Sequence, residues 1–169
     1  MRILALCGSL QSQSSNRELV ELVTRLALPG VQVVIFDGLR DLPHFDPDLE
    51  AEKELEVVRN WRKAIADSDA LLIASPEYGH SLPGVLKNAI DWVIGSGELE
   101  RKIVAVTASV PHLERGRRGL AALRETLGAV SAEVVGGEPI ARGPAFEAEL
   151  KQLVEQVVAC VRARAQSTP

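Results

Sequence analysis

The sequence predicts an α/β fold in which a five-stranded parallel sheet is covered by helices on both faces. Short apolar runs rich in β-branched residues alternate with longer amphipathic segments along the chain. The first run, residues 3–7, is continuously apolar, which is typical of a strand buried on both faces. The next segment, residues 16–27, instead carries its apolar side chains at helical spacing. Because strands that alternate with crossover helices form parallel sheets, the pattern predicts this class.

The later segments repeat this alternation. Further strands are predicted at residues 31–36, 70–74, 102–107 and 130–135, and further helices at residues 49–67, 82–94, 116–127 and 146–163. Five strands in 169 residues fit a three-layer, doubly wound sandwich with the flavodoxin-like strand order 2-1-3-4-5 better than a six-stranded dinucleotide-binding sheet. We therefore expect one domain over residues 1–169, with a disordered tail over residues 164–169.

The composition argues against several classes of protein. With 19 Lys and Arg against 23 Asp and Glu, the net charge of −4 gives no electrostatic footprint for nucleic acid or an anionic membrane. No apolar stretch approaches the length of about 18 residues that a membrane span needs. Cys7 and Cys160 lack the spacing of a redox or metal motif, so we expect free, buried thiols and a cytoplasmic location. No cluster of His, Cys and Asp has metal-ligand spacing, and no metal site is expected.

The strand order predicts where a ligand binds. In an open parallel sheet, ligands lie beyond the carboxyl ends of the strands where the order reverses, here between the first and third strands. The loops of residues 8–16, 75–81 and 108–116 should therefore meet there. The first loop places four serines and Asn16 just before a helix, whose free N–H groups and dipole favour a phosphate. Helix capping is the alternative, since Ser15 and Glu18 fit a capping box.

The first loop lacks the two best-known phosphate motifs. It has no G-x-x-x-x-G-K-[ST] sequence, which argues against an ATP- or GTP-hydrolysing P-loop. Gly8 is its only glycine, which argues against the G-x-G-x-x-G dinucleotide fingerprint, even though Asp37 ends the second strand where a ribose-binding acid could lie. A mononucleotide phosphate is the better interpretation.

The second loop carries a longer and more specific motif. Residues 75–92 read SPEYGHSLPGVLKNAIDW, which resembles the SPEYNxSxPGxLKNAIDW segment of the NADPH-dependent FMN reductase family. That family also includes quinone, chromate and azo-dye reductases. The first loop is similar to the family's GSLRxxSxNR phosphate loop, and residues 42–49, LPHFDPDL, are similar to a third family motif. The motifs stand in the family's order over most of the chain.

The resemblance implies a flavodoxin-like fold that binds FMN. Electrons would pass from NADPH or NADH through the flavin to a small acceptor such as a quinone, free flavin, azo compound or chromate. No catalytic side chain is expected, because the flavin supplies the hydride chemistry. The resemblance implies that the FMN phosphate is bound by Ser9, Gln11, Ser14, Ser15 and Asn16. It also implies that the isoalloxazine ring is lined by Pro76, Glu77, Tyr78, Gly79 and Ser109. Two residues depart from the family pattern: Gln11 replaces an arginine, and Gly79 replaces an asparagine.

The substrate side of the predicted site is less defined. His80 and His112 could donate to a developing anion, although solvated loop histidines are the alternative. Three arginines are candidates for the 2′-phosphate of NADPH or for an exposed helix start, namely Arg115, Arg117 and Arg118. The family resemblance implies a homodimer or homotetramer, with Trp92 and its helix at an interface or in the core. Two other functions remain open: a flavodoxin-type electron carrier and a flavin-free binding module.

Overall fold

A five-stranded parallel sheet forms the centre of the structure, a computed structural model that describes residues 1–52 and 55–167. The strands lie in the order β2-β1-β3-β4-β6. Their bounds are Gln32–Phe36 (β2), Arg2–Cys7 (β1), Ala70–Ala74 (β3), Ile103–Thr107 (β4) and Glu133–Gly136 (β6). Ala5 of β1 lies opposite Ile35 on one side and Leu72 on the other. Because β6 is the fifth strand of this sheet, the predicted flavodoxin-like order 2-1-3-4-5 is confirmed.

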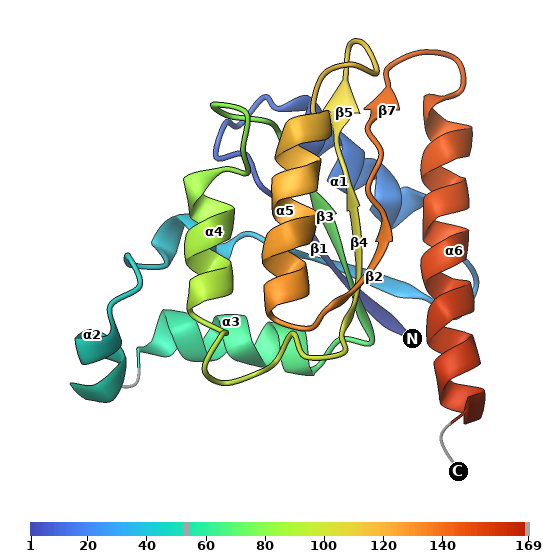
Figure 1. The fold of residues 1–169 in the computed structure, drawn as a ribbon. Helices are drawn as coiled ribbons and strands as arrows, with labels where there is room; N and C mark the ends of the chain where they lie inside the picture. The colour runs from blue at the N-terminus through green and yellow to red at the C-terminus, as the bar shows by residue number, and fades with distance from the viewer. Residues whose placement is uncertain (53–54, 168–169) are drawn as a thin grey trace.

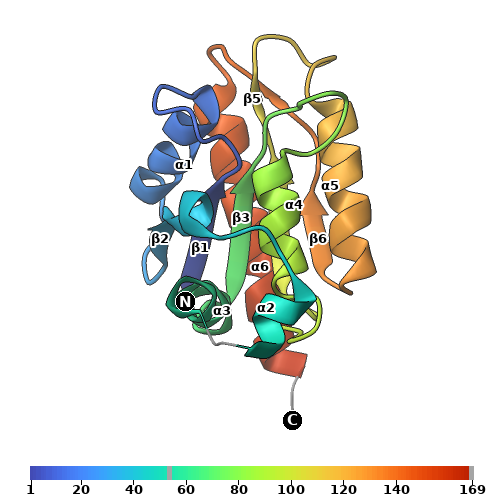
Figure 2. The same cartoon turned by 90° about the vertical axis from the view of Figure 1, so that its left-hand side faces the viewer.

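Helices cover both faces of the sheet (Figures 1 and 2). Helices α1 and α6 lie on one face, and α3, α4 and α5 on the other. Their bounds are Ser15–Arg25 (α1), Glu56–Ala66 (α3), Gly84–Asp91 (α4), Arg117–Ala129 (α5) and Phe146–Ser167 (α6). Side chains of β1 alternate between two cores: Ile3 and Ala5 pack with α1 and α6, whereas Leu4 and Leu6 pack with the other three helices. This burial on both faces explains why the strand sequences are continuously apolar.

The predicted helix over residues 49–67 is wrong as a single element. The chain forms two helices there, α2 (Pro47–Glu52) and α3, and residues 53–54 lie outside the described part of the structure. Leu55 precedes α3 with an extended backbone (φ −82°, ψ 128°) and packs against the core, so a continuous helix cannot pass through it. Helix α2 also begins earlier than predicted, at Pro47, because Asp46 Oδ1 accepts the Asp48 N–H at 2.9 Å and caps the helix.

Three other predicted boundaries shift at residues with distinct backbone conformations. Helix α4 begins at Gly84, because Pro83 is extended (φ −61°, ψ 141°) and serves as its N-cap. Helix α5 begins after Gly116, whose φ of +85° is left-handed. Strand β6 begins at Glu133 rather than at residue 130, since a turn containing Ser131 (φ +57°) lies between α5 and the strand.

The predicted disordered tail is wrong as far as Ser167, because α6 continues to that residue. Residues 168–169 lie outside the described part of the structure. Arg164, in the last turns of α6, pairs with the Glu133 carboxylate and donates to the Arg101 carbonyl. These contacts fasten the end of α6 to the start of β6 and explain the additional helical turn.

Helix α4 and the residue after it hold the neighbouring loop through buried polar contacts. Trp92 is 1% exposed, and its Nε1 donates to the Pro43 carbonyl at 2.8 Å. Asn88 donates to the same carbonyl at 2.8 Å and accepts the Phe45 N–H at 2.7 Å. The interpretation of Trp92 as a core residue is therefore confirmed, and an interface on the helix of residues 82–94 stays a prediction.

A second, two-stranded sheet stands at the carboxyl end of the main one (Figure 1). It pairs β5 (Ser109–Val110) in parallel with β7 (Ile140–Ala141). Ser109 therefore does not end the fourth strand, as the sequence predicted, but begins the short strand β5. A further backbone bond, from the Arg142 N–H to the Val110 carbonyl at 2.8 Å, brings the β7–α6 connection beside the loop that precedes α5.

Candidate functional site

A cleft of about 710 Å³ opens at the carboxyl end of the sheet, where the order of strands reverses. Residues of all three predicted loops line it. The predicted site residues that contribute to its wall are Ser9, Gln11, Ser14, Ser15, Asn16, Pro76, Glu77, Tyr78, His80, Ser109, Arg115 and Arg118. The topology therefore brings together side chains more than one hundred residues apart in the sequence.

The first loop presents backbone donors at the start of α1. Ser14 is the N-cap, with an extended backbone (φ −104°, ψ 133°) and a side chain that accepts the Asn16 N–H at 3.3 Å. The predicted capping box at Ser15 is therefore wrong, because Ser15 is already the first residue of the helix. Within the described residues, the N–H groups of Gln13, Ser14 and Ser15 donate to no other group of the chain. These donors and the helix dipole suit an anion.

Two side chains of α1 connect this loop to β5. Asn16 is 4% exposed, and its Oδ1 accepts the Ser109 N–H at 2.9 Å. Ser15 Oγ donates to the Ser109 carbonyl at 3.3 Å. The Ser109 hydroxyl is itself buried without a hydrogen-bond partner in the described part of the chain. An unpaired buried hydroxyl is unfavourable, so its position in the cleft wall is consistent with a polar ligand group.

The second loop forms a tight hairpin across the cleft. Tyr78 and Ser81 exchange two backbone hydrogen bonds of 3.0 Å each, and the two residues between them have left-handed φ angles, +57° at Gly79 and +63° at His80. Left-handed angles at both central positions are those of a type I′ turn, which favours glycine. Tyr78 is 53% exposed, and its hydroxyl lies 3.4 Å from Ser9 Oγ on the opposite loop.

The Glu77 carboxylate connects the hairpin to α5. Its Oε2 accepts the Gly119 N–H at 3.0 Å, and its Oε1 lies 3.2 Å from His80 Nδ1. The Gly119 hydrogen bond and, to a smaller extent, His80 lower the pKa of Glu77 below its ordinary value. The carboxylate is therefore ionised at neutral pH. His80, predicted on the substrate side, is bound to this carboxylate while its ring remains 71% exposed.

Three of the predicted site residues lie outside the described lining of the cleft. Gly79 is at the tip of the hairpin, where a Cβ atom would meet no described residue within 4 Å. His112 is exposed in the loop before α5. Arg117 lies on another side of α5, with its Nε 3.9 Å from Glu138 Oε2. Because residues three apart on a helix share a face and adjacent ones do not, Arg117 and Arg118 point in different directions.

Arg142, which was not predicted from the sequence, lines the same cleft as Arg115 and Arg118. It lies just beyond β7, a strand of only two residues, and so short a pairing leaves no recognisable pattern in the sequence. Other lining residues that were not predicted are Gln13, Val110, Pro111, Glu114 and Gly116. The cleft therefore contains three arginines and two glutamates, Glu77 and Glu114.

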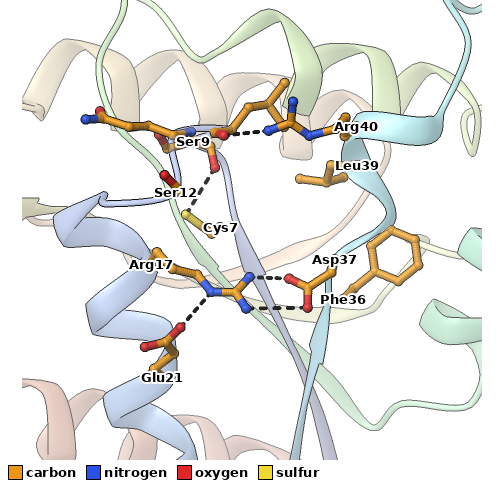
Figure 3. A pocket seen from close by; sticks show the side chains of 11 residues that line it. Cys7, Ser9, Ser12, Arg17, Glu21, Phe36, Asp37, Leu39 and Arg40 are labelled. Atoms are coloured by element: carbon orange, nitrogen blue, oxygen red, sulfur yellow. Dashed lines mark hydrogen bonds and ion pairs between the residues drawn. The ribbon is translucent and has the colours of Figure 1, made fainter.

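A smaller hollow of about 370 Å³ lies on the other side of the first loop (Figure 3). Its charged groups are already engaged with one another. The Arg17 guanidinium binds both carboxylate oxygens of Asp37 and also Glu21, and Asp37 raises the pKa of Arg17. Arg40 donates to the Leu10 carbonyl at 2.7 Å. Asp37, which ends the second strand, is thus paired with Arg17 in this structure.

The two cysteines differ in environment. Cys7 is buried at the floor of this hollow, its Sγ donates to the Ser9 carbonyl at 3.5 Å, and burial raises the pKa of its thiol. Cys160 is exposed on α6, so the prediction that it is buried is wrong. It lies on the outward face of an amphipathic helix, a face that a small residue can occupy without being buried. Both thiols are free, as predicted.

Comparison with known proteins places these features in a family. A model of the family described as NADPH-dependent FMN reductase matches residues 1–145. The NAD(P)H-dependent FMN reductase of Pseudomonas aeruginosa is 35% identical over 131 residues, which are 75% of this chain and 69% of that protein. The 2-hydroxy-1,4-benzoquinone reductase of a Burkholderia species is 40% identical over 92 residues, which are 54% of this chain and 49% of that protein. The matched region thus spans about half the length of the second relative.

Among solved structures, the flavoenzyme NAD(P)H:(acceptor) oxidoreductase FerB from Paracoccus denitrificans resembles this chain with a TM-score of 0.84. The two sequences are 26% identical, and the match covers 96% of this chain and 97% of that one. The similarity thus extends over nearly the whole length of both chains.

Proposed function

Because the chain belongs to the NADPH-dependent FMN reductase family, we propose that it is an NAD(P)H-dependent FMN and quinone reductase with FMN held in the 710 Å³ cleft. The observation that carries this proposal is the group of unpaired donors in the cleft wall. Three consecutive N–H groups at the start of α1 and the buried Ser109 hydroxyl have no partner among the described residues. These donors match a phosphate and a polar ring edge, so the residues fit a flavin mononucleotide.

The phosphate would lie at the first loop. The backbone N–H groups of Gln13, Ser14 and Ser15 would donate to its oxygens, with the dipole of α1 behind them. Asn16 has its Oδ1 committed to Ser109, which leaves its Nδ2 amide for the ligand. In place of the family's usual arginine, Gln11 would offer a neutral amide, so we expect backbone N–H groups to carry most of the phosphate binding.

The isoalloxazine ring would lie between the hairpin and β5. The Tyr78 N–H is committed to the Ser81 carbonyl, so the N–H groups of Gly79 and His80 are the hairpin donors that remain for the ring. The exposed Tyr78 ring offers an aromatic surface for stacking. When bound, FMN supplies the hydride and electron transfer between the nicotinamide donor and the acceptor. The side chains of the cleft contribute orientation and charge.

The cleft arginines indicate how an anionic donor would be held. Arg115, Arg118 and Arg142 line the same cleft, and each can form paired hydrogen bonds with a phosphate. We propose that they bind the phosphates of NADPH or NADH and that the 2′-phosphate of NADPH adds one contact. The assembly of the chain as a homodimer or homotetramer is also a proposal, supported by exposed apolar residues such as Leu10, Ile94 and Leu113. No helix among the described residues has both the length and the apolar character of a membrane span.

An assay of the purified chain tests the proposed function. We expect FMN to be retained or rebound with one flavin per chain, and NADPH or NADH to be oxidised when a benzoquinone, free FMN or an azo dye is supplied as acceptor. A chain that binds FMN but oxidises neither nucleotide would instead support an electron carrier. A chain that binds no FMN, even at saturating concentration, would contradict the proposal and favour a flavin-free binding module.

A further inference from the structure

Helix α5 begins without a cap of its own. The N-cap position is Gly116, which has a left-handed backbone (φ +85°). A glycine has no side chain that could accept a hydrogen bond from the first N–H groups of the helix. The first N–H groups of any helix lack partners inside the helix and must find them elsewhere. At α5 the partner comes from a different loop, forty-two residues earlier in the sequence.

Glu77 supplies this missing contact. Its Oε2 accepts the N–H of Gly119, the third residue of α5, at 3.0 Å. The two segments touch closely, because a Cβ atom at Gly119 would lie 3.0 Å from Glu77 Cα and 3.0 Å from the Ser81 carbonyl oxygen. The carboxylate thus acts as a capping side chain delivered from the hairpin, and a negative charge at this end of the helix is also favoured by its dipole.

The second carboxylate oxygen holds the turn of the hairpin itself. Glu77 Oε1 lies 3.2 Å from His80 Nδ1, and His80 adopts a left-handed φ of +63° that non-glycine residues rarely adopt. One side chain therefore contacts both the tip of the hairpin and the end of α5. Tyr78, which lies between Glu77 and His80, has its hydroxyl 3.4 Å from Ser9 Oγ across the cleft.

We propose that Glu77 is a positioning residue, whose carboxylate docks the hairpin of residues 76–81 onto α5 and thereby fixes the ring-side wall of the cleft. Through this contact Tyr78 and the free N–H groups of Gly79 and His80 keep a fixed place relative to Ser9, and the start of α5 keeps Arg118 on the cleft. Glu77 makes these contacts with protein groups, so it acts through the hairpin. The inference rests on the proposed function, because the wall that Glu77 fixes is the one assigned to FMN.

The test combines an amide measurement without flavin and a flavin titration. In the FMN-free chain, we expect the NMR signal of the Gly119 amide to shift with the titration of Glu77, below the ordinary pKa of a glutamate, and to lose this response in Glu77→Gln. His80 and Arg118 act on this carboxylate, and Glu114 and Arg115 of the preceding loop line the same cleft, so His80→Ala is run in parallel as a variant that keeps Glu77 but lacks the neighbouring imidazole.

The flavin titration then measures positioning. We expect Glu77→Ala to raise the Kd for FMN about tenfold and Glu77→Gln, which keeps an acceptor oxygen for Gly119, to raise it about threefold. Both should alter the visible circular dichroism of bound FMN, since the ring side of the cleft has moved. Ser14→Ala should weaken binding without this spectral change. Glu125→Ala, a glutamate on an exposed part of the same helix, is the matched control and should leave Kd and spectrum unchanged.

The outcomes separate this inference from the proposed function. Unchanged FMN affinity and spectrum in Glu77→Ala would overturn the positioning role while leaving the proposed function intact. A Gly119 amide that ignores the Glu77 titration in the wild type would also overturn it, and that measurement does not require any variant to fold. A wild-type chain that binds no FMN would contradict the proposed function, and the positioning role would fall with it.

Discussion

At the scale of single residues, a substitution of Ser109 can test ligand binding without changing the hydrogen bonds of the folded chain. Its backbone N–H and carbonyl are paired with Asn16 and Ser15, but its buried hydroxyl has no partner in the described part of the chain. A buried serine normally contributes to stability through the hydrogen bond of its hydroxyl. Here that bond is missing, so removing the hydroxyl takes no hydrogen bond away from the described part of the chain.

We therefore expect Ser109→Ala to leave the thermal stability of the FMN-free chain unchanged or slightly higher, and to raise the Kd for FMN about tenfold. Ser68→Ala is the matched control. Ser68 is buried far from the cleft, and its Oγ donates to the Ala64 carbonyl at 2.7 Å. That variant should melt at a lower temperature and bind FMN normally. If Ser109→Ala also melted at a lower temperature and bound FMN normally, Ser109 would have no role in binding.

The arginines near α5 also allow a test with an internal control. Arg115 and Arg118 line the cleft, whereas Arg117 lies beside Glu138. We expect the wild type to prefer NADPH to NADH by more than tenfold in kcat/KM, which corresponds to about 1.4 kcal/mol. Arg115→Ala combined with Arg118→Ala should remove this preference by lowering kcat/KM for NADPH more than for NADH, because NADH lacks the 2′-phosphate. Arg117→Ala should preserve it. Equal losses with both donors would show that these side chains shape the cleft generally.

At the scale of secondary-structure elements, the cleft depends on contacts between loops and helix starts. The hairpin of residues 76–81 lies against α5 at Gly119, where a Cβ atom would lie only 3.0 Å from Glu77 Cα and from the Ser81 carbonyl oxygen. Within a helix, glycine is ordinarily less favourable than alanine by about 0.5–1 kcal/mol. Its presence in the first turn of α5 is therefore explained by the close approach of the hairpin.

The two helical glycines of α5 give a direct comparison. Gly128 has open space around its Cβ position, so Gly128→Ala should raise the free energy of unfolding by about 0.5–1 kcal/mol. Gly119→Ala should instead lower it by about 1–3 kcal/mol, because the added methyl group lies 3.0 Å from backbone atoms of the hairpin. Denaturant unfolding of both variants measures the difference. A stabilised Gly119→Ala variant would mean that the hairpin and α5 are not in close contact.

The sequence predicts elements well where one local pattern decides them. The continuous apolar run of residues 3–7 is sufficient to predict a doubly buried strand, and the structure buries Ile3 and Leu4 in opposite cores. The prediction of one helix over residues 49–67 is wrong because Leu55 takes an extended conformation that its tertiary packing favours. Helix propensity is a weak preference that such packing readily overrides. The contact between Glu77 and α5 could not be predicted from a local sequence pattern either, because Glu77 and Gly119 are distant in the sequence.

At the scale of the whole molecule, topology places the site and contacts between loops complete it. Alternation of strands and helices predicts the strand order and hence the edge of the sheet where the loops of residues 8–16 and 75–81 meet. The pairing of β5 with β7, which brings Arg142 to the cleft, could not be predicted from two-residue strands. Likewise, the different directions of Arg117 and Arg118 depend on where α5 begins, and element boundaries are difficult to locate from sequence.

If the cleft recognises a flavin by its single phosphate, as proposed, then FMN, riboflavin and FAD should differ in affinity when they are compared by calorimetry. FMN, riboflavin and FAD share the same ring, so their affinities differ mainly through what is attached to it. We expect FMN to bind with one molecule per chain and at least about tenfold more tightly than riboflavin, because riboflavin leaves the N–H groups of residues 13–15 without a phosphate. FMN should also bind more tightly than FAD. Riboflavin binding as tightly as FMN, or FAD binding as tightly or more tightly, would contradict the account.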